Sequence, residues 1–166
     1  TNEVFYDDVK VPVSQLVGEE NKGWQYLVAA LSYERNWFVG NSLFYLESYI
    51  KYLQKTKRNG QYLIDDPVLK KEVGQLAIDL EVVRLFGLRI SCMLDKGTIP
   101  SYEAAMTKVF GSETWFQLLN SWLHSLNLYG QLDADSERVI ENGAVMQGYF
   151  LGVRSLLTRG TNDIMK

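Results

Sequence analysis

One unbroken hydrophobic repeat constrains the fold of this chain more than any other feature. Its members recur at alternating spacings of four and three, at Leu69, Val73, Leu76, Leu80, Val83, Gly87, Ile90 and Leu94. This spacing places them all on one face of a long helix. Asp66-Pro67 supplies a cap and a first-turn proline, and Gly97 is placed for the left-handed residue that ends a helix. The sequence therefore predicts a helix between these two signals with one buried face.

Three more segments show helical periodicity. The first runs from Asn21 to about Gln54, the second follows an expected cap at Ser101 and ends near Gly130, and the third is less regular and runs from about Arg138 to Leu157. The stripe of the second is Ala105, Val109, Ser112, Phe116, Leu119, Leu123 and Leu126. Long helices with short connections cover each other best as antiparallel neighbours. The predicted fold class is all-α, an antiparallel, up-down four-helix bundle.

The first residues follow a different pattern. Residues 2–12 carry β-branched and aromatic residues in rough alternation and end at Pro12, which is typical of a short strand. No second strand is predicted to pair with it, and a lone strand is unstable. We therefore expect an orphan last strand of a β-domain at residues 1–14 and a helical bundle domain at residues 15–166. On this interpretation the chain is a piece of a longer protein.

Composition and single residues argue against several classes of function. A net charge of −3 with scattered basic residues gives no surface for nucleic acid, and no run approaches the roughly 18 apolar residues of a membrane span. His124 is the sole histidine, which argues against multi-histidine metal sites and a Ser-His-Asp arrangement. Cys92 is the sole cysteine, and its position inside the apolar repeat predicts a packed side chain. We expect no bound metal. We also expect a reducing, cytoplasmic compartment.

One carboxylate lies on an apolar stripe. Glu34 falls between Leu31 and Phe38 on the stripe of the first helical segment. A buried carboxylate is costly to ionise, and this environment suits a base that abstracts a proton. The alternative is that Glu34 faces solvent or pairs with a basic residue of a neighbouring helix. Arg35 lies about 100° farther around the helix and either borders the same cleft or is an ordinary solvated arginine.

Two other features are weaker signals. The Gly160-Thr161 turn opens a helix, so its free amides and the positive end of the helix dipole can hold a phosphate. Many helices begin this way without binding anything. The four tryptophans, Trp24, Trp37, Trp115 and Trp122, are assigned no site, because aromatic residues at helical spacing more often form the core.

Taken together, these residues resemble the acyl-CoA dehydrogenase family along nearly the whole chain. The motifs that carry the resemblance are, in family order, residues 2–12, residues 16–24, Glu34-Arg35, Asp95-Lys96-Gly97, residues 104–110 and Gly160-Thr161-Asn162-Asp163-Ile164. The first two look like the last strand of the family's middle domain and the entry to its first carboxyl-terminal helix. The resemblance implies an enzyme built from an amino-terminal helical domain, a middle β-domain and this bundle, with FAD and an acyl-CoA thioester held between them.

The resemblance also implies a reaction and roles for four residues. In the family a glutamate removes the α-proton of an acyl-CoA thioester while the β-hydrogen leaves as hydride to the flavin, giving a trans-2-enoyl-CoA. The family places this base at either of two positions that meet in space, which are Arg159 and Glu34 here. Arginine cannot be the base, so the resemblance implies Glu34, as in the isovaleryl, long-chain and steroid side-chain branches. It implies that Arg35 contacts the CoA portion, and that Thr161 and Asn162 contact FAD near its phosphates.

The resemblance implies partners as well, and three positions depart from it. Electron-transfer flavoprotein is the expected electron acceptor, and a homo- or hetero-oligomer is the expected assembly. Thr56, Asn59 and His124 stand where the family has a flavin-contacting arginine, an aromatic residue and a glutamine, and such losses are compatible with unlike subunits that share fewer flavins than chains. The isolated chain is expected to be inactive and to hold no FAD.

Two alternative functions stay open at this point. The first is a non-catalytic assembly subunit or domain of a heteromeric acyl-CoA dehydrogenase complex. The second keeps the flavin and changes the chemistry, as in the nitroalkane oxidases and flavin monooxygenases of this scaffold. Those relatives generally lack a glutamate at the position of Glu34.

Overall fold

The computed structural model of the protein describes residues 2–35 and 38–166. The helices in these ranges are α1 (Gly23–Glu34), α2 (Phe38–Lys55), α3 (Pro67–Asp95), α4 (Ser101–Ser125), α5 (Ala144–Leu157) and α6 (Asn162–Met165). Short 3-10 turns are η1 (Val13–Gln15), η3 (Leu63–Asp65), η4 (Asn127–Gln131) and η5 (Glu141–Gly143). Strands β1 (Lys57–Arg58) and β2 (Gln61–Tyr62) form one antiparallel hairpin. The predicted all-α fold class is confirmed.

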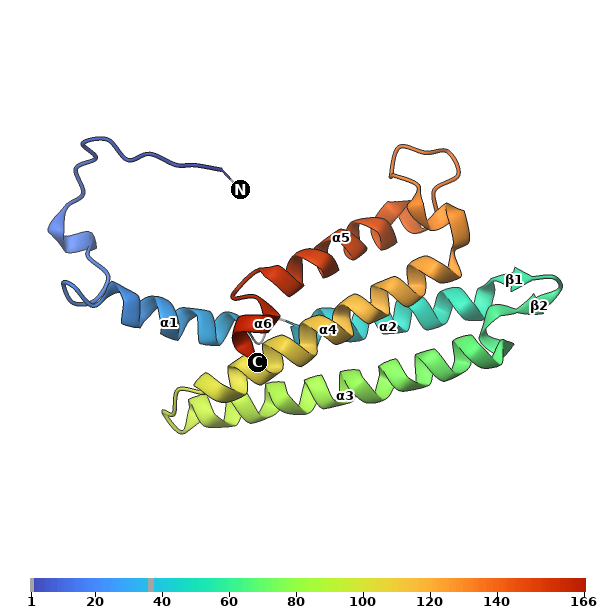
Figure 1. Ribbon diagram of the computed structural model, residues 1–166, viewed down its shortest axis with the longest axis horizontal. Helices are drawn as coiled ribbons and strands as arrows, with labels where there is room; N and C mark the ends of the chain where they lie inside the picture. Colours follow the sequence, from blue (N-terminus) through green and yellow to red (C-terminus); the bar gives the residue numbers. More distant parts are fainter. Residues whose placement is uncertain (1, 36–37) are drawn as a thin grey trace.

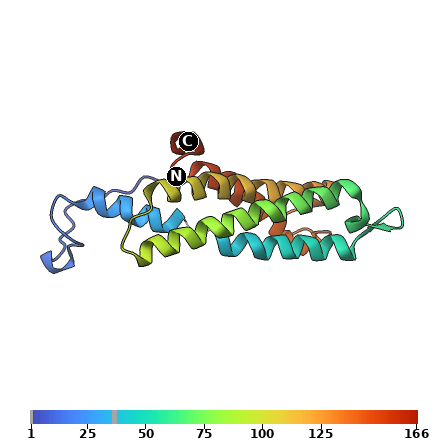
Figure 2. The ribbon, with the colours of Figure 1, turned by 90° about the horizontal axis from the view of Figure 1, so that it is seen from below.

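Four long helices, α2 to α5, lie side by side as an antiparallel bundle (Figure 1). The β1–β2 hairpin returns the chain from α2 to α3, a short loop joins α3 to α4, and a longer loop joins α4 to α5. In Figure 2 the same bundle is seen from below, with α1 extending beyond one end and the hairpin projecting from the other. The up-down topology predicted from the helical stripes is confirmed.

Helix α3 forms where its signals predict. The Asp66 carboxylate accepts hydrogen bonds from the amides of Val68 at 2.8 Å and Leu69 at 3.4 Å, and Pro67 is the first helical residue. Gly97 follows the helix with a φ of 72°, in the left-handed region. The buried residues of α3 are Val73, Leu76, Leu80, Val83, Gly87 and Ile90, all members of the predicted repeat. This face therefore lies against the bundle core.

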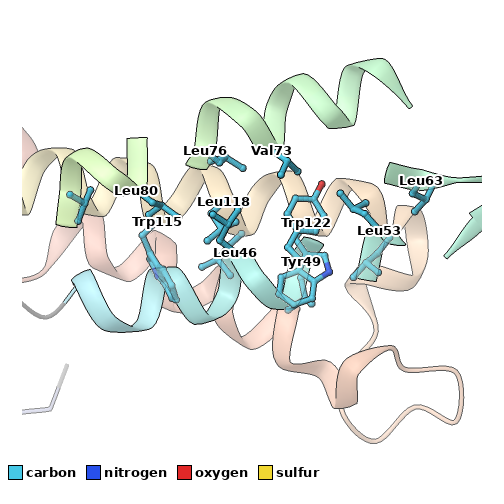
Figure 3. Packing of buried hydrophobic residues seen from close by; sticks show 14 residues of the cluster. Leu46, Tyr49, Leu53, Leu63, Val73, Leu76, Leu80, Trp115, Leu118 and Trp122 are labelled. Carbon is cyan, nitrogen blue, oxygen red and sulfur yellow. The ribbon is translucent and has the colours of Figure 1, made fainter. Parts of the chain in front are cut away.

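The core is centred on aromatic residues of α2 and α4 (Figure 3). The rings of Tyr49 and Trp122 stack with their centroids 5.5 Å apart, and Tyr45 meets the Trp115 ring edge-on at 4.8 Å. Leu118, which is fully buried, also belongs to this cluster. Fully burying a large apolar side chain contributes roughly 1.5–3 kcal/mol, so each of these residues stabilises the packing of α2 against α4.

Helix α4 differs from its prediction in two ways. Ser101 is the first helical residue, preceded by Pro100 at the cap position, so Ser101 does not cap the helix. Trp115, Leu118 and Trp122 are buried although they lie outside the predicted stripe, in addition to Leu119 and Leu126, which belong to it. The reason is that α4 is the central helix and contacts α2, α3 and α5 at once. A stripe calculation that assumes one buried face misses a helix covered on several sides.

The first helical segment is also corrected. The single helix predicted from Asn21 to Gln54 is described as two helices, α1 and α2, and Trp37 and the side chain of Phe38 lie outside the described residues. Helix α1 extends past the bundle end (Figure 1), where it touches α4. Trp24 is 75% exposed on it. Periodicity runs through both segments because both helices carry apolar residues, and among the described residues α2 is covered by α3 and α4 whereas α1 touches α4 near its end and leaves Trp24 and Leu27 exposed.

Helix α5 begins later than predicted. It starts at Ala144 instead of near Arg138, since Glu141, Asn142 and Gly143 all have left-handed backbone, with φ values of 51°, 53° and 74°. This conformation cannot continue a right-handed helix. The connection from α4 is correspondingly long and includes η4 and η5.

Residues 2–12 form no strand, and within the described residues sheet pairing is confined to β1 and β2. Their large apolar side chains are exposed, and the segment lies apart from the bundle helices in Figure 1. The orphan strand and the domain boundary after residue 14 stay predictions. Cys92 is exposed, so its predicted packing is wrong, because it lies between Ile90 and Leu94 off the buried face. None of the described helices is long and apolar enough to cross a membrane.

Candidate functional site

Two segments far apart in the sequence meet in an ion pair at the end of the bundle where α1 and α6 lie. Arg159 Nε donates a hydrogen bond to Glu34 Oε1 over 2.7 Å, although the residues are 125 positions apart. Glu34 is the last residue of α1, and Arg159 lies in the turn between α5 and α6. The structure thus brings together the two positions at which the family resemblance places a base.

The expectation that Glu34 is buried is wrong for this chain. Its side chain is 50% exposed, and it pairs with a basic residue of another segment, as the alternative interpretation predicted. The physical reason is that no other helix in the described part of the chain covers this side of α1. A carboxylate has about four lone-pair sites, so one hydrogen bond to Arg159 leaves acceptor capacity for a substrate proton.

The turn that carries Arg159 has an unusual backbone. Arg159 and Gly160 both have left-handed φ values, 60° and 91°, and a Cβ on Gly160 would overlap the Met165 side chain. Thr161 Oγ1 then accepts a hydrogen bond from the Ile164 amide at 3.4 Å and caps α6. The helix predicted to open at the Gly160-Thr161 turn is present as α6. The turn can take this path because Gly160 lacks a side chain.

Arg35 reaches the same turn by a different route. Its Nη2 donates to the Arg159 carbonyl oxygen at 3.5 Å. Its Nε is buried and finds no hydrogen-bond acceptor among the residues that the structure describes. A buried donor without a partner costs roughly 1–3 kcal/mol, so a bound group that accepted a hydrogen bond here would be stabilised. Binding of the CoA portion by Arg35 stays a prediction.

The two predicted FAD-contacting residues are placed very differently. Asn162 is buried, and its Oδ1 accepts hydrogen bonds from Lys108 Nζ and from Ser112 Oγ at 3.1 Å. Its Nδ2 donates to Glu113 Oε1 at 3.3 Å. The Asn162 side chain is therefore already engaged inside the protein and does not fit the role of a phosphate ligand. Thr161 is half-buried and borders an open hollow of about 450 Å³, so its hydroxyl fits a polar contact to a bound group.

A second hollow lies between α3 and α4, and one of the departures from the family pattern, His124, lines it. Its volume is about 400 Å³, and His124 and Arg58 line it together with the carboxylates of Asp66, Glu72 and Asp79. Arg58 Nη2 donates to the Ser125 carbonyl at 2.7 Å. Three carboxylates facing one engaged guanidinium repel a diphosphate. The residues present here do not fit the phosphate portion of FAD.

The sequence analysis missed the polar residues of α4 that surround Asn162. Lys108 is fully buried, Ser112 was counted only as a small residue of the stripe, and Glu113 was not singled out. The sequence does contain one signal for them: Lys108 and Ser112 are four residues apart, so they lie on the same side of a helix that is otherwise rich in apolar residues. That signal alone does not distinguish an engaged lysine from a solvated one.

The family comparison agrees with this geometry. Residues 21–166 match the family model described as acyl-CoA dehydrogenase, C-terminal domain. Acyl-CoA dehydrogenase FadE26 of Mycobacterium tuberculosis is 27% identical over 173 residues, an alignment that covers 100% of this chain and 43% of that protein. Because the family model covers most of its length, the chain belongs to the acyl-CoA dehydrogenase family and corresponds to the carboxyl-terminal domain.

Solved structures show the same fold. Butyryl-CoA dehydrogenase from Megasphaera elsdenii superposes with a TM-score of 0.80 at 20% identity, covering 96% of this chain and 41% of that one. A chain of the ChsE4-ChsE5 complex from Mycobacterium tuberculosis gives a TM-score of 0.78 at 24% identity, covering 97% and 42%. The chain thus spans about two fifths of the length of the relatives it resembles.

Proposed function

We propose that the protein containing this chain is an FAD-dependent acyl-CoA dehydrogenase, and that Glu34 is its general base. The substrate class is an acyl-CoA thioester, and the product is the trans-2-enoyl-CoA. The observation that carries the proposal is the 2.7 Å approach of Glu34 to Arg159, because it joins the two places where this family locates a base. Only one of the two residues is able to accept a proton.

In this proposal Glu34 removes the α-proton of the thioester. Its carboxylate pairs with the Arg159 guanidinium at 2.7 Å, and a carboxylate within reach of the substrate is the kind of group that serves as a general base. The pairing also holds the carboxylate in one orientation, which matters because proton transfer requires close alignment. When Glu34 accepts the proton it loses its charge, so the pairing with Arg159 weakens and the guanidinium becomes available to a negative group nearby.

The flavin, when bound, supplies the acceptor for the hydrogen that leaves the β-carbon. Within this chain we propose Thr161, which borders an open hollow, as a contact to FAD, while the acidic hollow beside His124 is not suited to the FAD phosphates. We therefore propose that most contacts to FAD come from residues outside this chain. Arg35, whose buried Nε meets no acceptor in the described ranges 2–35 and 38–166, is the proposed contact for the CoA portion of the substrate.

A second candidate function is non-catalytic assembly with a catalytic relative. The acidic hollow favours it, since a subunit that offers no phosphate contacts is suited to a heteromeric complex, and one similar structure is titled as a ChsE4-ChsE5 complex. We propose that the whole protein assembles as a homo-oligomer or a hetero-oligomer. We propose electron-transfer flavoprotein as its electron acceptor. The exposed Cys92 thiol is compatible with a reducing, cytoplasmic compartment.

The test uses Glu34→Gln in the whole flavin-loaded protein and follows bleaching of the flavin after rapid mixing with acyl-CoA thioesters. Glutamine keeps the size and the acceptor for Arg159 but cannot take a proton. The bleaching rate should fall by about two to four orders of magnitude. The matched control is Glu81→Gln, because Glu81 also pairs with an arginine at 2.7 Å and is similarly exposed, 51% against 50%.

Arg159→Ala separates the roles of the two partners. It removes the guanidinium that aligns Glu34 but leaves the Glu34 carboxylate, so substrate binding should weaken and flavin bleaching should survive at a rate reduced about tenfold, far less than the loss in Glu34→Gln. Bleaching of the Glu34→Gln protein at the wild-type rate would favour the assembly function instead.

A further inference from the structure

We propose that Lys108 is a positioning residue: its buried ammonium joins the end of α5 to the start of α6 and so sets the Arg159 turn against Glu34. The inference rests on the proposed function for its catalytic consequence. Its structural part, the control of the turn by Lys108, stands on the contacts alone.

The contacts of Lys108 span the turn on both sides. Its Nζ donates to the Leu156 carbonyl oxygen at 3.2 Å, in the last turn of α5, and to Asn162 Oδ1, in the first residue of α6. Lys108 itself lies on α4, the central helix of the bundle. One ammonium group on a rigid helix therefore holds the residues on either side of the segment 157–161.

Asn162 extends this link to two more residues of α4. Ser112 Oγ donates to Asn162 Oδ1 at 3.1 Å, and Asn162 Nδ2 donates to Glu113 Oε1 at 3.3 Å. Glu113 also pairs with Lys166 over 3.3 Å. The Asn162 amide uses both its oxygen and its nitrogen, so its orientation is fixed from two directions.

Placing a cation here is unfavourable in itself. Burial lowers the pKa of the Lys108 ammonium, and the nearby guanidinium groups of Arg35 and Arg159 lower it further, while Glu113 raises it. An apolar side chain of similar length is often neutral or stabilising in place of a buried charge. The ammonium is better explained by what it holds, since its position next to Leu156 and Asn162 is set by hydrogen bonds that no apolar residue can make.

The held turn carries the residue that touches Glu34. Arg159 lies between the two anchored residues and adopts a left-handed backbone with a φ of 60°, which a non-glycine residue takes only when its surroundings impose it. If the anchors are lost, the turn is free to relax, and both the Arg159 guanidinium and its carbonyl, which Arg35 contacts, move with it. Small displacements near a reacting group are costly, up to about a hundredfold in rate for 1 Å.

The first experiment measures the turn without using catalysis. Lys108→Met is made in the whole protein, because methionine keeps the length and removes the charge. Amide hydrogen exchange is then followed by mass spectrometry. Peptides covering residues 156–166 should exchange about tenfold faster or more, while peptides from α3 should be unchanged. Unchanged exchange at 156–166 would overturn the inference, whatever the role of Glu34.

The second experiment tests the acceptor side and uses a conservative rescue. Asn162→Leu has nearly the same shape but no polar atoms. Asn162→Asp keeps the oxygen that Lys108 and Ser112 bind, and it is made together with Glu113→Gln so that two carboxylates do not face each other where Asn162 Nδ2 now donates to Glu113. The limiting rate of flavin reduction at saturating acyl-CoA should fall about tenfold or more in Asn162→Leu and largely recover in Asn162→Asp. The apparent dissociation constant of the thioester should change much less.

The results also separate the two proposals. If Lys108→Met exchanges faster at residues 156–166 while Glu34→Gln reduces its flavin at the normal rate, Lys108 controls the turn and Glu34 is not the general base. Equal reduction rates in Asn162→Leu and Asn162→Asp would overturn the positioning role. If Lys108→Met fails to fold, hydrogen exchange on Asn162→Leu, with Asn162→Asp as its control, decides the structural part in the same way.

Discussion

Gly148 on α5 lies directly against Leu119 on α4. A methyl group on Gly148 would be 2.9 Å from Leu119 Cδ2 and 3.2 Å from Tyr45 Cε1. One turn later, a Cβ on Gly152 would come within 3.2 Å of Leu119 Cδ1. Helices α4 and α5 therefore approach closely along a pair of glycines, and this approach brings the turn after α5 to the site.

Gly148→Ala is expected to destabilise the protein by about 1–3 kcal/mol, because the added methyl group overpacks a filled core. Urea unfolding followed by circular dichroism measures the change. Gly74→Ala is the matched control, since Gly74 is also inside a helix but a Cβ there meets nothing within 4 Å. It should stabilise by roughly 0.5–1 kcal/mol. Equal effects of the two substitutions would contradict the close packing of α4 and α5.

Alkaline pH should weaken the fold through Tyr49. Burial raises the pKa of its phenol above the ordinary value of 10.0, although a hydrogen bond with Ser121 lowers it in part. Above about pH 10 the unfolded chain therefore loses this proton first, and the free energy of unfolding falls by at most ~1.4 kcal/mol per pH unit for each such group. Tyr49→Phe should show a shallower decline in urea titrations between pH 9 and pH 11 (about one unit on either side of that value). A slope identical to the wild type would refute this assignment. Tyr52, whose pKa burial also raises, accounts for part of the slope that remains.

The isolated chain is expected to hold no FAD and to self-associate. The acidic hollow does not fit the cofactor phosphates, and α1 exposes Trp24 and Leu27 to solvent. Contiguous exposed apolar surface favours association. Visible absorbance of the purified chain tests the first statement, and sedimentation over a concentration series tests the second. Trp24→Glu should shift the association toward monomer, and stoichiometric flavin in the purified chain would contradict the cofactor expectation.

Local signals were sufficient for much of the fold. The Asp66 cap, the left-handed Gly97 and the buried face of α3 were all predictable, because each depends on residues close in sequence. The division between α1 and α2 and the burial of Trp115 were not. They depend on which helices cover which faces, and this information is not contained in the periodicity of one segment.

The candidate site was predictable only in part. Glu34 stood out by its place on an apolar stripe, but its exposure and its pairing with Arg159 arise from a contact between the two ends of the chain. Lys108 is fully buried and engaged by residues 48 and 54 positions away. Interactions at such separations leave no regular spacing in the sequence, so only the assembled structure shows them.

The central claim, that Glu34 takes the α-proton, is tested most directly by hydrogen–deuterium exchange at the α-carbon of a bound thioester. A 3-thia-acyl-CoA is suitable, because sulfur replaces its β-carbon and no hydrogen can leave from that position. The whole flavin-loaded protein is incubated with it in D₂O, and loss of the α-proton signal is followed by NMR. The account predicts rapid exchange in the wild type and in Glu81→Gln, and exchange slower by about two to four orders of magnitude in Glu34→Gln. Exchange at the wild-type rate in Glu34→Gln would show that another group is the base.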